Sequence, residues 1–516
     1  MLTPHFVLTA KEKYDIQTML LNNTGYSGKI LLIDLNNEAA YPTLAIGALV
    51  SPLKQAGYDV DVFSPLAHGM KPLARDQQEN LVDYVVARLL FAASPLFAWA
   101  NEFLYATYCK IRFRATKRLR RKYRSILKSG QYDVVMVSSY LQYYRITKAI
   151  AEETKVQKIP LLLGGPYFNH RKVAEEWLKI DGVTAIFGGE ADFIIHELAH
   201  GIISGSDVSS IKGIFRQEIT AVGQAADPVQ IEEGLPIPDF DHFRWHDYPH
   251  RVLPIMTGRG CGWGHCLFCS DVTTASTRTF RSRSLSSVLN ELQVQSQRYG
   301  AKNFIFFDSK LNSNLDIWFG VINGIQRVVP GAAWVASVHV DGKGVNGLDL
   351  ETLRRAFNAG LRRVSFGLET GSHRLNKLML KGTTIERTSQ FVKDAKSVGI
   401  SIRTTIILGY PGETPADIRA TTSFLRTHIG SLDRVKLSRF KAIPGTAFHE
   451  RLKQKPEKYP GVVNPIWDYR FARAIYDYRP SKNPEYRLAK AELIKTVYVI
   501  NKKEITDSAQ QFNGLM

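Results

Sequence analysis

Three of the four cysteines lie within nine residues of one another, at Cys261, Cys266 and Cys269. They occupy a glycine-rich loop, TGRGCGWGHCLFCS, that follows an apolar segment typical of a buried strand. Glycine lets such a loop curl until its thiolates converge on one metal centre. Convergent thiolates select an iron–sulfur cluster or zinc. Three ligands would leave one iron of a cluster open, whereas a structural zinc site needs a fourth ligand, for which His265 is the nearest side chain.

The cysteine count argues against a disulfide framework, because cysteines two residues apart are rarely bridged in a secreted scaffold. Only Cys109 lies outside the cluster. The stretch Met1–Met19 has no cationic start followed by an apolar run, so we expect no secretory signal. Clustered thiols in such a chain predict a metal site in a reducing compartment, and therefore a cytoplasmic protein.

A first series of apolar segments predicts a parallel sheet near the N-terminus. The expected strands are Lys29–Asp34, Tyr58–Phe63, Tyr132–Ser138, Pro160–Leu163 and Val183–Phe187, and Leu44–Gly57 has helical spacing. Strands that alternate with helices form a doubly wound sheet, in which ligands bind at the carboxyl ends of the strands. Two glycine turns, Gly164-Gly165-Pro166 and Gly188-Gly189-Glu190, fall at such ends.

A second series of strands begins near the cysteine loop. Its members are Val252–Met256, Asn303–Phe307, Trp334–Val338, Arg363–Phe366, Ser401–Leu408 and Arg434–Phe440. Six strands with helices between them suit a barrel or partial barrel, whose chemistry lies at the carboxyl ends of the strands. We expect an N-terminal segment (1–28), a Rossmann-like domain (29–200) with a helical, basic insertion (66–130), a linker (201–250), a barrel (251–450) and a small helical C-terminal extension (451–516).

The charge of the chain is concentrated in that insertion. The formal net charge is +19, and Lys110–Arg124 holds nine basic residues and no acidic ones. Before it, Tyr84–Tyr108 is strongly apolar but is interrupted by Arg88, Pro95 and Glu102, so a helical hairpin is favoured over a membrane span. The basic stretch is either a solvated helix face or a contact for an anionic partner or a membrane surface at 84–124. We expect no nucleic acid partner.

The chain resembles the radical S-adenosylmethionine (radical SAM) family in the order and spacing of four motifs. These are the cysteine cluster, Phe366–Ser372 (FGLETGS), Lys381-Gly382-Thr383 and Ile406–Thr414 (IILGYPGET). The family's usual cysteine spacing is three residues, then two, whereas this chain has four, then two. Together the motifs span about residues 251–447.

The resemblance implies a [4Fe-4S] cluster on Cys261, Cys266 and Cys269, whose open iron is chelated by S-adenosylmethionine (SAM). One electron would then cleave SAM to methionine and a 5′-deoxyadenosyl radical. The implied SAM-binding residues are Phe268, which would lie against the adenine, Asp308, Glu369, Arg403 and Gly409. Arg403 and Lys381 are the candidate partners of the SAM carboxylate. Asp308 has an alternative interpretation as the N-cap of a helix.

A Rossmann-like domain before such a barrel is similar to the cobalamin-binding subclass. The residues that would line the corrinoid are Pro42, Ser138, Ser139, Gly164, Gly165, Gly188, Gly189 and Glu190. The alternative is a degenerate domain that binds nothing. None of the 13 histidines has an Asp two residues earlier, so we expect cobalt without a histidine ligand. Methylthiotransferases are disfavoured, because their second cluster needs three more cysteines.

The resemblance therefore predicts a C-methyltransferase that uses a 5′-deoxyadenosyl radical and methylcobalamin to methylate an unactivated carbon. A radical rearrangement or cyclisation, in which cobalamin transfers no methyl group, is the alternative within the family. A redox- or cobalamin-responsive regulator is the non-enzyme alternative. The expected partners are an external flavodoxin- or ferredoxin-like electron donor and a small-molecule, peptide or lipid substrate.

Overall fold

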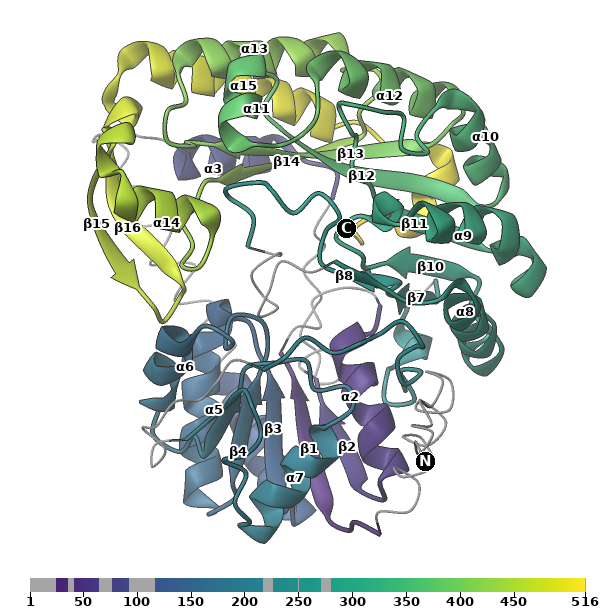
Figure 1. The fold of residues 1–516 in the computed structure, drawn as a ribbon, viewed down its shortest axis with the longest axis vertical. Coiled ribbons are helices and arrows are strands. Elements are labelled where there is room, and N and C mark those ends of the chain that lie inside the picture. The colour runs from purple at the N-terminus through teal and green to yellow at the C-terminus, as the bar shows by residue number, and fades with distance from the viewer. Residues whose placement is uncertain are drawn as a thin grey trace, which may run out of the picture.

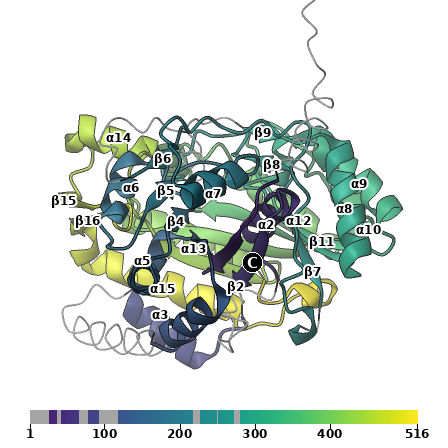
Figure 2. The ribbon, with the colours of Figure 1, turned by 90° about the horizontal axis from the view of Figure 1, so that it is seen from below.

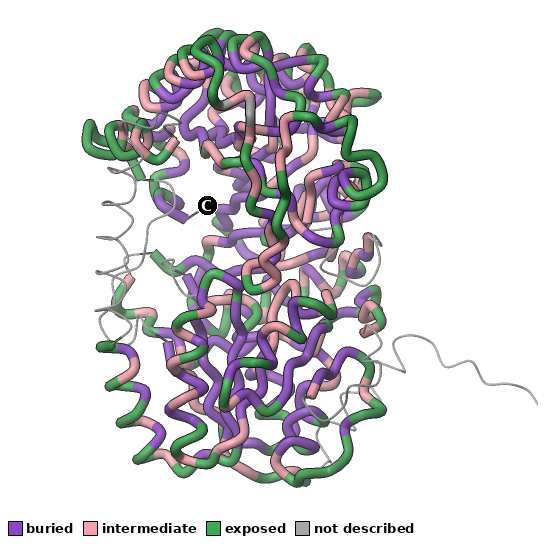
Figure 3. The backbone as a smooth tube through the Cα atoms, turned by 90° about the vertical axis from the view of Figure 1, so that its left-hand side faces the viewer, coloured by how far each residue is buried: buried purple, intermediate pink, exposed green. Residues whose placement is uncertain are grey.

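The computed structural model describes residues 25–35, 41–64, 77–91, 117–216, 226–248, 250–270 and 280–515. These residues form two α/β units, each built on a six-stranded sheet, with one unit stacked on the other (Figure 1). Buried residues are concentrated along the middle of each unit (Figure 3). Cys109, most of the apolar stretch and the first half of the basic stretch lie outside the described residues.

The N-terminal sheet has the strand order β2-β1-β3-β4-β5-β6. Its strands are β1 (Lys29–Asp34), β2 (Asp59–Phe63), β3 (Val134–Ser138), β4 (Leu161–Gly164), β5 (Ala185–Phe187) and β6 (Ile214–Phe215). The first five are parallel and coincide with the predicted strands, and only β6 is antiparallel. The sequence of β1, KILLID, is a buried run of apolar residues because both faces of the sheet are covered.

Alternate residues of β1 face two helical layers. Ile30 and Leu32 pack with α2 (Leu44–Gln55) and α7 (Ile195–Ser204), whereas Leu31 and Ile33 pack with α5 (Tyr144–Val156), α6 (Arg171–Leu178) and the helical residues 117–130. The sheet is therefore doubly wound, as the alternation of strands and helices predicts.

The second sheet has the order β14-β13-β12-β11-β10-β7, and all its strands are parallel. They are β7 (Val252–Ile255), β10 (Asn303–Phe306), β11 (Ala333–Ser337), β12 (Leu361–Glu369), β13 (Ser401–Leu408) and β14 (Arg434–Arg439). Each predicted strand has its counterpart here. The first and last strands are not paired with each other, so the barrel is open, which confirms the predicted six-stranded partial barrel.

Helices wrap the outer face of this open barrel (Figure 1). They are α8 (Leu285–Tyr299), α9 (Leu315–Val328), α10 (Leu350–Asn358), α11 (His373–Met379), α12 (Ile385–Ser397) and α13 (Pro415–Thr427). Two short strands, β8 (Gly258–Arg259) and β9 (Arg281–Ser282), pair beside the cysteine loop. The large hydrophobic cluster of this unit lies between the strands and these helices.

The C-terminal extension differs from the purely helical segment that the sequence predicts. It contains α14 (Ala447–Gln454), an antiparallel pair β15 (Val462–Asp468) and β16 (Arg473–Tyr478), and α15 (Pro484–Asn501). α15 packs against α13 and β14 and so covers the outer face of the last barrel strand. α3 (Leu81–Leu90) of the insertion also packs against α15 (Figure 2). Tyr84 of α3 stacks on Tyr498 of α15.

Part of the basic stretch is engaged inside the N-terminal unit. Leu119 and Tyr123 are buried, and Arg120 and Arg124 pair with Glu153 of α5 at 2.5 and 2.6 Å. Their hydrogen bonds, Arg124 foremost, lower the pKa of Glu153 to about 2 against the opposing effect of burial. These arginines are thus structural. Among the described residues, no helix is long and apolar enough to cross a membrane.

Candidate active site

The cysteine loop leaves the carboxyl end of β7, and its three cysteines are half-buried. Backbone hydrogen bonds fix its second half. Leu267 N–H donates to the carbonyl of Met379 at the end of α11 (3.1 Å), and Phe448 N–H of α14 donates to Leu267 O (2.9 Å). Burial raises the pKa of the Cys266 thiol, and the nearby Lys381 ammonium opposes that effect.

The spacing of these thiols bears on the kind of centre they could hold. Among the described residues, no three His, Cys, Asp or Glu side chains are grouped closely enough to hold one metal ion. A single zinc needs every sulfur at about 2.3 Å from one centre. A cubane cluster, by contrast, takes three thiolates on three separate irons.

The Lys381-Gly382-Thr383 motif supports the first half of the loop. Trp263 donates its indole N–H to Leu380 O at 2.9 Å and lies over Gly382. A Cβ at Gly382 would come within 2.3 Å of the indole ring, and the φ of this residue is +73°, so glycine is required there. The motif therefore shapes the cysteine loop as well as contributing the Lys381 side chain.

Glu369 ends β12 at a local irregularity of the sheet. Its φ is +61°, and the register between β12 and β13 shifts between Gly367 and Glu369. Its carboxylate accepts a hydrogen bond from Thr405 Oγ1 at 3.0 Å and lies 3.9 Å from Lys381 Nζ. Glu369 and Lys381 are both buried, so the carboxylate is held at the carboxyl ends of β12 and β13. A non-glycine residue at positive φ is uncommon and concentrates at functional sites.

Asp308 joins the carboxyl ends of β7 and β10. Its carboxylate accepts hydrogen bonds from Thr257 N–H (3.1 Å) and Thr257 Oγ1 (2.7 Å). Burial raises its pKa to about 6, against the opposing hydrogen bonds from Thr257 and Gly258. The N-cap alternative is wrong, because α9 is capped by Asn314, whose side chain accepts from Asp316 N–H and Ile317 N–H.

The other predicted SAM-binding residues lie on neighbouring elements of the barrel. Arg403 of β13 is buried and donates to Ser365 Oγ of β12 at 3.0 Å. Phe268 packs against a cluster that includes Tyr410, Phe440 and Phe448. Gly409 follows β13 with φ +84°. A Cβ added to Gly409 would lie 3.9 Å from Tyr486 Oη and 4.0 Å from Tyr478 Cε1, which are ordinary contact distances.

His339 is a polar residue of this region that the sequence analysis missed. It lies just beyond β11, and its ring stacks on Trp263 with the centroids 5.9 Å apart. Its backbone N–H donates to Asn312 Oδ1 at 2.8 Å, and Nε2 has no hydrogen-bond partner among the described residues. Burial, and then Lys381 and Lys310, lower its pKa to about 3, so the imidazole is neutral at pH 7. No sequence motif marks this position.

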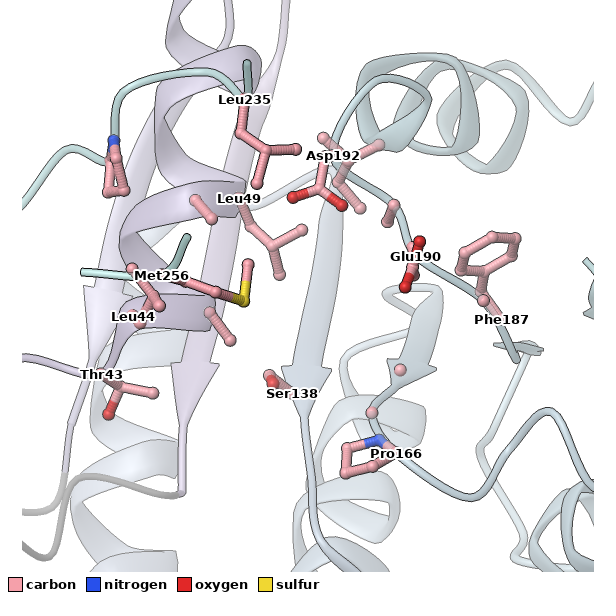
Figure 4. A pocket seen from close by; sticks show the side chains of 18 of the residues that line it. Thr43, Leu44, Leu49, Ser138, Pro166, Phe187, Glu190, Asp192, Leu235 and Met256 are labelled. Atoms are coloured by element: carbon pink, nitrogen blue, oxygen red, sulfur yellow. The ribbon is translucent and has the colours of Figure 1, made fainter. Parts of the chain in front are cut away.

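A cavity of about 470 Å³ lies where the two units meet (Figure 4). The N-terminal unit contributes α2 residues and the strand ends Ser138, Gly164, Gly165 and Pro166, together with Gly189 and Glu190. The barrel and linker contribute the opposite wall, including Met256, Arg259, Phe307 and Leu235. The cavity therefore lies at the carboxyl ends of both sheets.

The structure separates the predicted corrinoid residues into two groups. Ser138, Gly164, Gly165, Gly189 and Glu190 line the cavity. Pro42, Ser139 and Gly188 do not, although Tyr41 and Thr43 beside Pro42 do. Ser139 is fully buried and donates to Tyr140 O, and a Cβ at Gly188 would lie 2.1 Å from Phe168 O. Ser139 and Gly188 are thus engaged with neighbouring backbone rather than with the cavity.

The lining of the cavity fits a large flat macrocycle. Leu44, Leu49, Met256 and Leu235 offer apolar surface, and Ser138 and Asp192 offer polar groups (Figure 4). Gly165 brings backbone close to this space: its φ is +138°, and a Cβ would meet Ser139 O at 2.0 Å. No histidine is among the described residues that line the cavity.

An ion-pair cluster closes one side of the cavity and joins the two units. Arg259 forms a bidentate pair with Asp192 at 2.8 and 2.9 Å and lies 3.1 Å from Glu190. Arg281 forms a second bidentate pair with Glu190 at 2.7 and 2.8 Å. Burial would raise the pKa of Glu190, but these arginines hold it below its usual range. The Glu190 carboxylate is thus engaged by protein cations.

The barrel matches a known family. Residues 255–425, from the end of β7 into α13, match the Radical SAM superfamily model. This stretch contains the cysteine loop, Glu369 and Gly409. Residues 255–425 are therefore a radical SAM domain.

Curated relatives extend the similarity. An uncharacterized methyltransferase of Pyrococcus horikoshii is 27% identical over 329 residues, which cover 62% of this chain and 67% of the relative. A protein of Methanocaldococcus jannaschii named as a putative methylthiotransferase is 25% identical over 353 residues, which cover 63% and 71%. Both alignments are longer than the radical SAM domain, so part of the remaining chain is related as well.

Two solved structures share the whole arrangement. TsrM from Kitasatospora setae, a radical SAM methyltransferase with cobalamin and a [4Fe-4S] cluster bound, has a TM-score of 0.63, with 16% identity and coverage of 92% of this chain and 89% of that one. OxsB, a cobalamin-dependent radical SAM enzyme with aqua-cobalamin and SAM bound, has a TM-score of 0.64, with 15% identity and coverage of 90% and 66%. The chain thus has the fold of cobalamin-dependent radical SAM enzymes, a Rossmann-like domain followed by a partial barrel.

Proposed function

We propose that this chain is a cobalamin-dependent radical SAM methyltransferase that methylates an unactivated carbon of its substrate. The observation that carries the proposal is the cavity between the strand ends of the N-terminal sheet and the barrel, one wall of which is Met256 at the end of β7. The same strand leads into the cysteine loop, so a corrinoid and a cluster would adjoin one reaction space. When bound, the cluster supplies the electron that cleaves SAM, and cobalamin supplies the methyl group.

The chain's own residues hold and orient these groups. Cys261, Cys266 and Cys269 ligate the cluster, and Glu369 receives the amino or ribose hydroxyl groups of SAM. Thr405 and Lys381 fix the Glu369 carboxylate and limit its rotation. Phe268, Asp308, Arg403 and Gly409 complete the proposed SAM site, which the aromatic cluster around Tyr410 shields from water.

The N-terminal unit holds the corrinoid through close backbone approach. Ser138, Gly164, Gly165, Gly189 and Glu190 face it, and Ser139 and Gly188 support the adjoining turns. Pro42 stands between Tyr41 and Thr43, which also line the cavity. We propose that cobalt is bound without a histidine ligand, because none of the 13 histidines has an Asp two residues earlier. Electron paramagnetic resonance of the cob(II) form tests this: nitrogen superhyperfine splitting from an axial protein ligand would contradict it.

The experiment for the whole proposal is anaerobic reconstitution with iron, sulfide, cobalamin and SAM, followed by turnover with a substrate panel. The panel starts with small molecules and includes tryptophan, with which TsrM has been solved as its substrate. It continues with a peptide bearing an acidic leader and a lipid. We expect a product heavier by one methyl group.

The by-products separate the candidate reactions. Methylation of an unactivated carbon yields 5′-deoxyadenosine together with S-adenosylhomocysteine, because a second SAM remethylates the cobalt. A rearrangement yields 5′-deoxyadenosine alone. If protein loaded with the cluster and cobalamin binds SAM but does not cleave it, the result would instead favour a redox- or cobalamin-responsive regulator.

We further propose that the enzyme works in the cytoplasm with an external flavodoxin- or ferredoxin-like electron donor. Contact with a membrane surface or another anionic partner is a proposal for the exposed basic residues Arg118, Arg121 and Lys122. Their replacement by alanine would weaken vesicle binding if such contact exists.

A further inference from the structure

Two tyrosine hydroxyls of the C-terminal extension reach the loop that follows β13. Tyr486 of α15 donates to Glu413 Oε2 at 2.5 Å, and Tyr478 of β16 donates to Tyr410 O at 2.9 Å. The loop Gly409–Glu413 is therefore connected to both parts of the extension, although some seventy residues of chain intervene.

Hydrogen bonds within the loop also fix its conformation. Glu413 Oε2 accepts a second hydrogen bond from Gly409 N–H at 2.8 Å, and Glu413 N–H donates to Tyr410 O at 2.8 Å. Gly409 and Gly412 both have positive φ, at +84° and +95°, so the loop follows a path that few other residues allow. One carboxylate oxygen thus links α15 directly to the backbone of Gly409.

These groups are sealed from solvent. Tyr410 is 0% exposed, Tyr486 2% and Glu413 5%. Water is poorly placed to substitute for a lost partner, and a buried group left without its hydrogen bond carries a large penalty. The contacts are therefore a fixed part of the loop's conformation.

We infer that the C-terminal extension is part of the SAM site, with Tyr486 and Tyr478 as positioning residues that hold the loop Gly409–Glu413 in its binding conformation. The inference rests on the proposed function, in which Gly409 lines the adenine of SAM. Neither tyrosine contacts SAM in this arrangement, since each acts through Glu413 or Tyr410.

The electrostatic surroundings of Glu413 predict that SAM binding depends on pH. Burial raises its pKa to about 7, while hydrogen bonds from Tyr486 and Gly409 oppose that rise. Asp417 of α13 adds to the rise, and Lys490 of α15 opposes it. Tyr478 and Tyr476 of β16 stay protonated, because burial raises the pKa of both phenols.

Above pH 7 the Glu413 carboxylate is ionised, and a charged acceptor strengthens both of its hydrogen bonds. SAM affinity should therefore rise from pH 6 to pH 8. The rise should be up to about tenfold, because the ionised fraction of Glu413 changes by that factor across this interval. Tyr486→Phe removes a donor that favours the ionised form, so the midpoint should move to higher pH. Glu413→Gln should abolish this dependence.

The test measures SAM binding by equilibrium dialysis with anaerobically reconstituted full-length protein. Tyr486→Phe and Tyr478→Phe each delete one hydroxyl, and we expect each to weaken SAM binding about tenfold. Tyr498→Phe is the matched control, since this tyrosine lies on the same helix but stacks on Tyr84. Iron content and cobalamin absorbance should equal those of the wild type in all three variants.

Each outcome has a distinct meaning. A wild-type protein with a full cluster that binds no SAM would refute the proposed function. A wild type that binds SAM, with Tyr486→Phe and Tyr478→Phe equal to it, would overturn this inference alone. The inference would also be overturned if Tyr498→Phe weakened SAM binding equally, or if Glu413→Gln left the pH profile of SAM binding unchanged.

Discussion

At the scale of single residues, the clearest consequence concerns the three thiols. Replacing Cys261, Cys266 or Cys269 by alanine leaves the proposed cluster one ligand short, so iron content and 5′-deoxyadenosine formation should collapse. Cys109→Ala should change neither quantity. Iron and sulfide analysis of the reconstituted proteins measures this, and full cluster loading in the triple variant would disprove the assignment.

His339 gives a second prediction at this scale. His339→Phe keeps a ring against Trp263 but removes Nε2, a buried atom that has no hydrogen-bond partner among the described residues and that we propose bonds SAM or the substrate. We expect 5′-deoxyadenosine formation to fall about tenfold, the cost of one buried hydrogen bond, while iron and cobalamin loading stay normal. His373→Phe, at an exposed histidine paired with Glu386, is the control. If 5′-deoxyadenosine forms at the same rate in His339→Phe, Nε2 makes no hydrogen bond that the reaction needs.

At the scale of elements, the turn after β4 decides how close the backbone comes to the cavity. Gly165→Val would force a Cβ to within 2.0 Å of Ser139 O at φ +138°, so the turn must move. We expect cobalamin absorbance to drop by roughly tenfold or more, with cluster loading retained on the separate barrel. Gly205→Ala is the matched control, because Gly205 also has positive φ (+69°) but meets nothing within 4 Å. Equal cobalamin binding by Gly165→Val would remove this turn from the proposed site.

At the scale of the whole molecule, the Arg259–Asp192 and Arg281–Glu190 pairs hold the two units together. Glu190→Gln leaves Arg281 without its bidentate carboxylate, and we expect a loss of about 2 kcal/mol of stability at pH 7, the value for a hydrogen bond to a charged group. Glu175→Gln breaks an exposed pair with Arg171 and should cost less than about 0.5 kcal/mol. Thermal unfolding measures both, and equal melting temperatures for Glu190→Gln and wild type would contradict a structural role for this cluster.

The Glu190–Arg281 pair also predicts how the stability of the protein changes in acid. The pKa of Glu190 is lowered in the folded protein, so its contribution is fully present above the ordinary pKa of a glutamate and is lost as the pH falls through the lowered value. The difference in melting temperature between the wild type and Glu190→Gln should therefore shrink in acid. A difference that stays constant from about pH 7 to about pH 3 would argue against the carboxylate as its source.

Much of the fold could be predicted from the sequence because buried parallel strands leave an unambiguous mark. β1 and β3 are runs of apolar residues, since both faces of their sheet are covered. The glycine turns after β4 and β5 could be recognised for a related reason, because at Gly165 and Gly188 another backbone segment comes too close for a side chain. The β15–β16 pair escaped prediction because its strands are mostly half-buried or exposed and carry no such run.

The sequence by itself determined which residue types were present for the chemistry, namely clustered thiols, a carboxylate at the end of a strand and glycine turns. These signals are local, since ligand spacing and backbone conformation are properties of neighbouring residues. Only the tertiary structure decided what those residues face. The pairing of Glu190 with Arg281, the stacking of His339 on Trp263 and the contact of Tyr486 with Glu413 join segments distant along the chain. Such contacts depend on how packed elements meet, and no local pattern encodes them.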